Sequence, residues 1–259
     1  MKNNSTPLRR FWVEYRENKV AVLAMVFLVA LILLAIFAGF VSPQDPYDLA
    51  NLSLMDSRRP PGFVGSGGYT HILGTDPQGR DLLSAIFYGL RISIMIGLAA
   101  GFVSLSLGTA LGITAAYVGG RVESLIMRLI DLQLSFPAIL LALVIVALLG
   151  QGKIQLIGAL VAAQYAYFAR TAYGAAKAER GKDYIEAALA TPLSGRLVVW
   201  RHLLPNCTPP LIVVATVQIA NAISLEATLS FLGLGLPVTE PSLGMLISNG
   251  FPYMMSGRY

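Results

Sequence analysis

A run of 22 residues without a charge, VAVLAMVFLVALILLAIFAGFV, occupies positions 20–41. About 20 predominantly apolar residues cross the hydrocarbon core of a bilayer as one helix. A secretory signal peptide is the alternative, but its apolar region covers only about 7–15 residues and ends at a small-x-small cleavage site. The chain continues instead into Ser42-Pro43-Gln44-Asp45. We therefore predict a retained membrane helix over 20–41.

The composition of the whole chain agrees with a membrane protein. Of its 259 residues 55% are hydrophobic and 13% are charged, whereas soluble domains average about 45–50% apolar and 25% charged residues. This excludes a disordered or nucleic-acid-coating protein and disfavours an ordinary soluble enzyme. The single Cys207 permits no internal disulfide, and with only two His residues a metal site of the usual His/Cys kinds is not expected.

Five apolar segments are predicted to cross the membrane, at about residues 20–41, 92–118, 132–149, 154–172 and 209–231. The charges between them indicate sidedness, because cytoplasmic segments retain Lys and Arg. Residues 1–19 hold five Lys and Arg and residues 170–208 hold six, whereas residues 42–90 hold five Asp against three Arg. The N-terminus and the 170–208 segment are therefore expected in the cytoplasm, and the 42–90 segment outside.

These spans divide the chain into four predicted parts. They are a cytoplasmic segment at 1–19, a first membrane helix at 20–41, an extracytoplasmic loop with an interfacial helix at 42–91, and a core at 92–259 that includes a cytoplasmic loop at 170–208. In the outer loop, Asp76 is expected to cap a helix that has Pro77 in its first position. His71 and Arg80 either position this loop or bind a ligand, and positioning is favoured.

A stripe of small residues follows one face of the second predicted span. It consists of Gly97, Gly101, Ser104, Gly108 and Gly112. Small side chains let membrane helices approach closely. The stripe either packs against other helices of this chain, which is favoured, or lines a seam with a partner subunit.

A short polar helix is predicted in the 170–208 loop. Asp183 is expected as its N-cap with Glu186 three residues later, close to a capping box. Because charged side chains are costly in lipid, this helix belongs in water. Its small Ala187 and Ala188 suit a helix that docks into a groove on another protein, and Pro192 is expected to end it. The predicted docking residues are Asp183, Tyr184, Ile185, Glu186, Ala187, Ala188 and Leu189.

Five motifs, in order along the chain, carry a family resemblance. They are HILGTDPQGRD at 71–81, Gly119-Gly120-Arg121 before LSFP at 134–137, Glu186-Ala187-Ala188 with Pro205 nineteen residues after the Glu, RHLLPN at 201–206 and EATLSFLGLG at 226–235. The third resembles the EAA loop of ATP-binding-cassette importer permeases. Together they resemble the C-type permease of the dipeptide, oligopeptide and nickel importer family, from about residue 19 to the end.

The resemblance implies an all-α polytopic bundle in a bacterial inner membrane. Besides the lipid bilayer, it implies three kinds of partner: a homologous second permease, two ATP-binding subunits and an extracytoplasmic substrate-binding protein. The EAA helix would dock onto an ATP-binding subunit and act as a rigid lever on the spans beside it. No cofactor is expected on this chain, because ATP and magnesium would bind the partner subunits.

Two departures from the family pattern stand out. The EAA loop normally has Gly six residues after the Glu, where this chain has Pro192, which disfavours the helical region for Thr191. Docking is expected to be kept, with its geometry left open. The family also usually has a sixth span after the outer loop, and residues 232–259 contain no further apolar run of that length. A sixth span is then either absent or outside this sequence.

The chain contains no phosphate-binding loop of the Walker A type, since Gly181-Lys182 is followed by Asp183 where Ser or Thr binds magnesium. GxSxG, HExxH and paired-Cys motifs are also missing, so no catalytic residues are predicted. Polar residues inside spans are candidates for a transport pathway, since they usually face the bundle interior or water. The alternative is that these side chains form hydrogen bonds between helices. This alternative stays open for Gln164 and Gln218 and is favoured for Asp131. The candidates are Asp131, Gln133, Gln164, Gln218, Asn221 and Glu226.

Three functions remain in competition. The first is an importer permease subunit for di- or oligopeptides that forms half of a translocation pathway. The second keeps this architecture and carries nickel, glutathione or another small solute. The third is a truncated or non-transport membrane scaffold. Association with ATP-binding subunits separates the first two from the third, and uptake measurements separate the first from the second.

Overall fold

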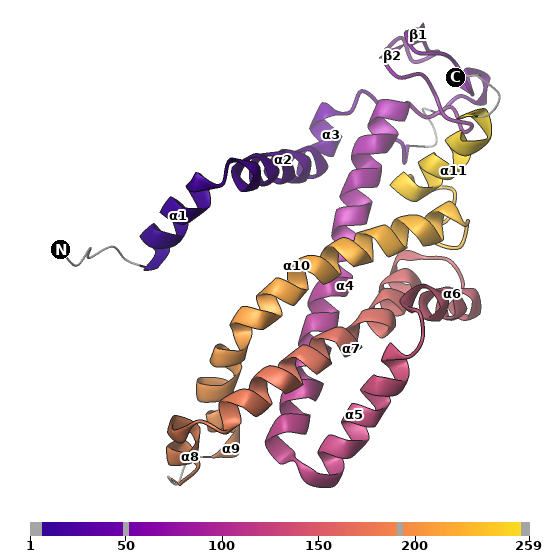
Figure 1. Cartoon of the computed structure of the whole chain (residues 1–259). Coiled ribbons are helices and arrows are strands. Elements are labelled where there is room, and N and C mark those ends of the chain that lie inside the picture. The colour runs from indigo at the N-terminus through magenta and orange to yellow at the C-terminus, as the bar shows by residue number, and fades with distance from the viewer. Residues whose placement is uncertain (1–6, 49–51, 191–193, 255–259) are drawn as a thin grey trace. The chain divides into compact units, whose positions relative to one another are not determined.

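The computed structural model describes residues 7–48, 52–190 and 194–254 (Figure 1). The chain divides into two units, Met1–Arg91 and Ile92–Tyr259, which are considered separately below. Nearly all regular structure in both units is helical. Together with the apolar helices described below, this confirms the predicted all-α membrane fold.

The first unit begins with α1 (Pro7–Glu17), α2 (Lys19–Ile36) and α3 (Ala38–Val41). The Asn18 side chain caps α2 by accepting a hydrogen bond from the Ala21 N–H at 3.1 Å. The predicted helix over 20–41 is therefore wrong in one respect: Phe37 interrupts it with φ −90° and ψ 13°. Hydropathy detects that both sides of this position are apolar, and it carries no information on a local turn between them.

The outer loop contains a 3₁₀ turn, η1 (Leu54–Asp56), and a two-stranded hairpin of β1 (Phe63–Val64) and β2 (Thr70–His71). The strands pair antiparallel, with Phe63 opposite His71. Beneath the hairpin, polar side chains are buried together. Arg80 Nε donates to Asp76 Oδ2 at 2.7 Å, and His71 Nδ1 lies 3.0 Å from Asp81 Oδ1. His71 and Arg80 are each 1% exposed, so both hold the loop together, as favoured from the sequence.

The start of the following helix differs from its prediction. Asp81, not Asp76, caps it: Asp81 Oδ2 accepts from the Ser84 N–H and hydroxyl, both at 2.7 Å. Asp76 instead closes a turn, with its Oδ1 accepting from the N–H groups of Gln78 and Arg80. The Asp-Pro pair at 76–77 looks like a helix start because the same side-chain acceptor suits both a cap and a turn.

The helix that Asp81 caps is α4 (Leu82–Val118), a single helix of 37 residues. At 1.5 Å per residue it is about 55 Å long. The separate interfacial helix predicted at 82–91 is therefore continuous with the second predicted span. Arg91 interrupts the apolar pattern, but it does not interrupt the backbone hydrogen bonds.

Beyond α4, the second unit contains seven further helices and one π-helical segment among its described residues (Figure 1). They are α5 (Gly120–Leu134), α6 (Ala138–Leu149), α7 (Lys153–Arg180), α8 (Asp183–Ala190), α9 (Gly195–Val198), η2 (Val199–Leu203), α10 (Leu204–Phe231) and α11 (Leu243–Met254). The segment from α9 to the end of α10 forms one helical stretch, so the span predicted at 209–231 begins earlier. Helix α11 lies in the region where no span was predicted.

The span predicted at 132–149 is not one continuous helix in the structure. Helices α5 and α6 meet at a bend of 90° around Ser135-Phe136-Pro137. Pro137 has no N–H to donate, and it disfavours the helical region for the residue before it. Since α6 has 12 residues, it is about 18 Å long and too short to cross the bilayer core of about 30 Å alone.

Helix α7 lies at the centre of the second unit, packed against α5, α6 and α10 (Figure 1). Its buried positions are mostly alanines, which allow close approach. The small stripe of α4 uses this property: a Cβ added at Gly108 or Gly112 would lie 2.4 Å from the Tyr165 carbonyl oxygen or 2.3 Å from that of Ala169. Gly97 and Gly101 instead approach Ile223 and Ile219 of α10. The stripe therefore packs within this chain.

Among the described residues, three helices or helical stretches are long and apolar enough to cross a membrane, namely Lys19–Ile36, Leu82–Val118 and Gly195–Phe231. The bent pair α5 and α6 adds a fourth if it counts as one span. Helix α7 was predicted as a span. It is long enough to cross a membrane, but with its polar residues it is not among the helices that are also apolar enough. The count of five stays a prediction. A helix enclosed by others needs less apolar surface than one that faces lipid.

Candidate functional site

The two charged pathway candidates both have partners. Asp131 lies at the surface and forms an ion pair with Arg170, with Arg170 Nη2 2.9 Å from Asp131 Oδ1. Glu226 is fully buried, and its two carboxyl oxygens accept from the hydroxyls of Ser93 and Ser230 at 2.7 and 2.8 Å. Ser93 belongs to α4 and Glu226 to α10. These carboxyl groups therefore hold helices together, the reading favoured for Asp131 from the sequence.

The uncharged candidates lie together. Gln164, Gln218 and Asn221 line one cavity of about 300 Å³ between α7, α10 and Ala138 at the start of α6. Asn221 Nδ2 donates to Gln218 Oε1 at 3.1 Å. Gln164 is 1% exposed, and within the described residues neither Nε2 nor Oε1 of its carboxamide has a hydrogen-bond partner. We call this cavity the amide cavity.

Sequence reasoning missed the other polar residues of the amide cavity. Tyr167 comes from α7, and Ser224 and Thr228 continue the face of α10 that carries Asn221. Asn221 and Ser224 are three residues apart and Ser224 and Thr228 four, a helical spacing that was visible in the sequence. Gln133, the remaining candidate, does not line the cavity, because its Nε2 donates to the carbonyl of Ala162.

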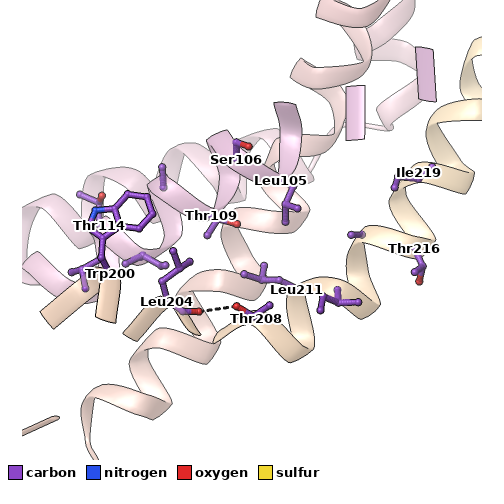
Figure 2. Close-up of a pocket in the computed structure, with 15 residues that line it drawn as sticks. Leu105, Ser106, Thr109, Thr114, Trp200, Leu204, Thr208, Leu211, Thr216 and Ile219 are labelled. Carbon is purple, nitrogen blue, oxygen red and sulfur yellow. Dashed lines mark hydrogen bonds between the residues drawn. The ribbon is translucent and has the colours of Figure 1, made fainter. Parts of the chain in front are cut away.

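A larger cavity of about 660 Å³ lies between α4 and the segment from η2 to α10 (Figure 2). Its lining is mainly aliphatic, with Trp200 at one end and the threonines 109, 114, 208 and 216 along its length. Thr208 satisfies its own hydroxyl by donating to the Leu204 carbonyl at 3.0 Å, as the dashed line in Figure 2 shows. The described lining contains no charged side chain. This surface therefore suits an apolar segment better than a charged solute.

Helix α8 has one buried side and one exposed side. Ile185 is 1% exposed and packs with Leu203 and Cys207, and Ala188 is also buried. Asp183, Tyr184, Glu186 and Ala187 are exposed. Ala188 therefore faces this chain and does not belong to the predicted docking surface. The side chain of Leu189 and the predicted helix end at Pro192 lie outside the described residues.

The cap predicted for α8 is shifted by one position. The carbonyl of Lys182 accepts the first backbone hydrogen bonds, from Ile185 and Glu186, so Asp183 is the first helical residue. Its carboxylate still suits this place, because negative charge near a helix N-terminus is favourable.

Glu179, in the last turn of α7, connects to the start of α8. The Lys182 ammonium and the Tyr184 hydroxyl both donate to it at 2.5 Å. These two hydrogen bonds lower the pKa of the Glu179 carboxyl below its ordinary value of 4.5. The same contact raises the pKa of the Tyr184 hydroxyl to about 12. Charge and hydrogen bonding thus join α7 to α8 at neutral pH.

A pH dependence of this connection follows from the two shifts. The lowered pKa of Glu179 gives stability that is present above 4.5 and is lost as the pH falls through the folded-state value. The raised pKa of Tyr184 gives stability that is complete below pH 10 and is lost as the pH rises through about 12.

Hydrogen exchange of residues 183–190, corrected for its intrinsic pH dependence, should therefore show stable protection from pH 5 to 9 and a loss below pH 4. In Tyr184→Phe the protection at pH 7 should fall severalfold, whereas Tyr167→Phe should leave it unchanged. Equal protection in all three proteins at every pH would contradict this role of Glu179.

No group of three or more His, Cys, Asp or Glu side chains is placed to hold a metal ion within the residues that the structure describes. Cys207 is a free cysteine, and its side chain is buried.

Comparison with known proteins supports this architecture. Residues 108–257 match the model of the family described as binding-protein-dependent transport system inner membrane component. Residues 6–61 match a second model, the N-terminal TM domain of oligopeptide transport permease C. The two matches together include the first predicted span, α8 and the amide cavity.

Curated proteins are similar over nearly the whole chain. The dipeptide transport system permease protein DppC of Haemophilus influenzae is 34% identical over 98% of this chain and 85% of its own length. The di/tripeptide transport system permease protein DppC of Pseudomonas aeruginosa is 36% identical, over 96% of this chain and 81% of its own. The Escherichia coli K12 dipeptide permease DppC is 36% identical over 97% and 83%. The chain is therefore a member of the family of binding-protein-dependent transport system inner membrane components.

Proposed function

We propose that this protein is a membrane subunit of an ATP-driven importer for di- or oligopeptides and forms half of its translocation pathway. Its partners in this proposal are a homologous second permease, two ATP-binding subunits that carry ATP and magnesium, and an extracytoplasmic substrate-binding protein. Its N-terminus lies in the cytoplasm of a bacterium, below the inner membrane. The observation that carries the proposal is its similarity, over nearly its whole length, to permeases named for dipeptide transport.

The geometry of α8 supports the coupling part of this proposal. Ile185 packs in one cluster with Ala176 of α7 and with Leu203 and Cys207 at the start of the last long helical stretch. A force on α8 therefore reaches α7 and α10 through packed side chains, and these two helices line the amide cavity. The exposed side, with Asp183, Tyr184, Glu186 and Ala187, is free for an ATP-binding subunit.

Glu186→Lys tests the docking of α8. The substitution reverses a charge on the exposed side and leaves the anchor Ile185 in place. We expect the amount of ATP-binding subunit that co-purifies from native membranes in mild detergent to fall at least severalfold. Glu17→Lys, the same change at another exposed residue on α1, should leave it unchanged. Elution of the purified variant at the wild-type volume in size exclusion shows that its fold is intact.

Two results would contradict the coupling role: unchanged co-purification of Glu186→Lys, or normal peptide uptake by cells that carry it. A solvated loop with no coupling role predicts both.

Mass spectrometry of proteins that co-purify with the N-terminally tagged wild-type chain tests the proposed assembly as a whole. Two ATP-binding proteins, a second permease and a binding protein are expected, and ligand eluted from the binding protein identifies the cargo. Nickel, glutathione or another small solute in that eluate would replace peptides as the cargo. Recovery of the chain alone would favour a scaffold.

A further inference from the structure

The described lining of the amide cavity is polar but contains no charged side chain. Its described lining has the carboxamides of Gln164, Gln218 and Asn221 and the hydroxyls of Tyr167, Ser224 and Thr228, with Ala138 and Leu225 as apolar residues. Both anionic pathway candidates are excluded from it: Asp131 pairs with Arg170 at the surface, and Glu226 is enclosed by Ser93 and Ser230. A ligand group that binds here meets hydrogen-bond donors and acceptors of neutral charge.

Gln164 is the residue of this cavity whose missing hydrogen bonds need an explanation. Its side chain is buried and lines the cavity, and no residue that the structure describes bonds its donor or its acceptor. A buried polar group without a partner is unfavourable, and most buried polar groups in proteins are bonded. The described residues of this chain supply no partner for the carboxamide. A group that enters the cavity from outside the chain can supply one.

The mouth of the cavity points to the same conclusion. Asn221, Ser224 and Thr228 are exposed on one face of α10. The hydroxyls of Ser224 and Thr228 are satisfied by their own helix, donating to Ala220 and Ser224 carbonyls. The Asn221 carboxamide is bonded through one of its donors to Gln218. Polar side chains inside a membrane usually face a water-filled path or a partner, since lipid leaves their remaining groups unpaired.

We infer that the amide cavity is a binding subsite for the backbone amide group of the transported peptide, with Gln164 as its principal hydrogen-bonding residue. This inference rests on the proposed function. A side-chain carboxamide carries an N–H donor and a carbonyl acceptor in the same plane, as a peptide group does, so the two can bond reciprocally. A volume of about 300 Å³ admits a small peptide fragment together with water. Because the cavity is neutral, it binds what all peptides share and does not select among their side chains.

The experiment uses the whole transporter, reconstituted in vesicles with its binding protein, and the probe peptides Ala-Gly and Ala-Sar. Sarcosine is N-methylglycine, so it differs from glycine only in having a methyl group in place of the amide hydrogen, and both terminal charges stay in place. The binding protein is the same for every permease variant. Any change between variants in the uptake ratio of the two peptides therefore belongs to the permease. Uptake and the thermal midpoint of the purified complex are both measured.

Gln164→Leu replaces the carboxamide by an apolar side chain of similar size. We expect Ala-Gly uptake to fall about tenfold, as for the loss of one good hydrogen bond, and the ratio of Ala-Gly to Ala-Sar uptake to move towards 1. The thermal midpoint should rise by about 2–4 °C, because an unpaired buried group is removed. Gln155→Leu, the same change on α7 at a residue that does not line the cavity, should alter neither the uptake nor the ratio.

The outcomes separate the two proposals. Wild-type vesicles that take up neither peptide would overturn the proposed function. Uptake by wild type with an unchanged ratio in Gln164→Leu would overturn only the subsite, and would leave the cavity to water. A lower midpoint, or failure of both Gln164→Leu and Gln164→Met to assemble, would show that the carboxamide is structural and would also overturn it.

Discussion

Arg80→Ala should destabilise the fold of the outer loop by about 3–5 kcal/mol, the range for removing one partner of a buried ion pair. Arg80 and Asp76 are 1% and 4% exposed, and their side chains meet at 2.7 Å. Without the guanidinium, the Asp76 carboxylate stays buried, with only backbone N–H groups to bond it. The neighbouring pair of His71 and Asp81, and Asp81's role as the cap of α4, depend on the same loop geometry.

The effect is measured as resistance of residues 52–81 to a protease in the purified protein, over a denaturant series. Arg59→Ala is the matched control, because Arg59 is an exposed arginine in the same loop that donates to the Met55 carbonyl and lies over the ring of Phe63. Exposed contacts of this kind contribute less than about 1 kcal/mol each. Equal sensitivity of the two variants would show that the buried pair does not hold the loop.

Gly112→Ala should also have a large effect, on the second unit. The added Cβ would lie 2.3 Å from the Ala169 carbonyl oxygen and 2.8 Å from the Ala172 Cβ, and both atoms belong to the central helix α7. Neither atom is the end of a flexible side chain, so α4 and α7 must move apart. Overpacking of this kind costs about 1–3 kcal/mol. The thermal midpoint in detergent should fall accordingly.

Gly158→Ala is the control for this substitution. Gly158 lies in α7, and a Cβ there meets nothing within 4 Å. Alanine is the better helix former by about 0.5–1 kcal/mol, so this variant should be slightly stabilised. Opposite signs for the two variants are therefore expected. A similar small effect of both would mean that α4 and α7 are not in the described contact.

Several features of the protein follow from sequence because each depends on local residue types. The apolar content and the uncharged run at 20–41 indicate a membrane helix, and the structure forms α2 over most of this run. The glycine spacing in α4 requires a close neighbour, and α7 and α10 supply it. The Glu-Ala-Ala motif and its companions identify the family, as the comparisons confirm. Their roles in coupling and in the pathway remain proposals.

Other features were decided by the tertiary structure. Residues 132–149 are mostly apolar, but the chain bends by 90° between α5 and α6. Pro137, at this bend, has no N–H to donate and disfavours the helical region for the residue before it, which a count of apolar residues does not register. The sequence placed Ala187 and Ala188 on one docking face, whereas packing of Ile185 against Leu203 turns Ala188 inward.

The polar residues inside the bundle show the same division between sequence and structure. A pattern of residues indicates that Asp131, Gln164, Gln218, Asn221 and Glu226 must avoid lipid, since exposure there is costly for any of them. Which of these side chains stays available to bond a group from outside the chain depends on what lies opposite each one in space. Arg170 lies opposite Asp131, and two serines lie opposite Glu226. Nothing within the described chain bonds Gln164. The sequence determined which residues need a partner, and only the packing of α4, α7 and α10 decided which of them the chain itself satisfies.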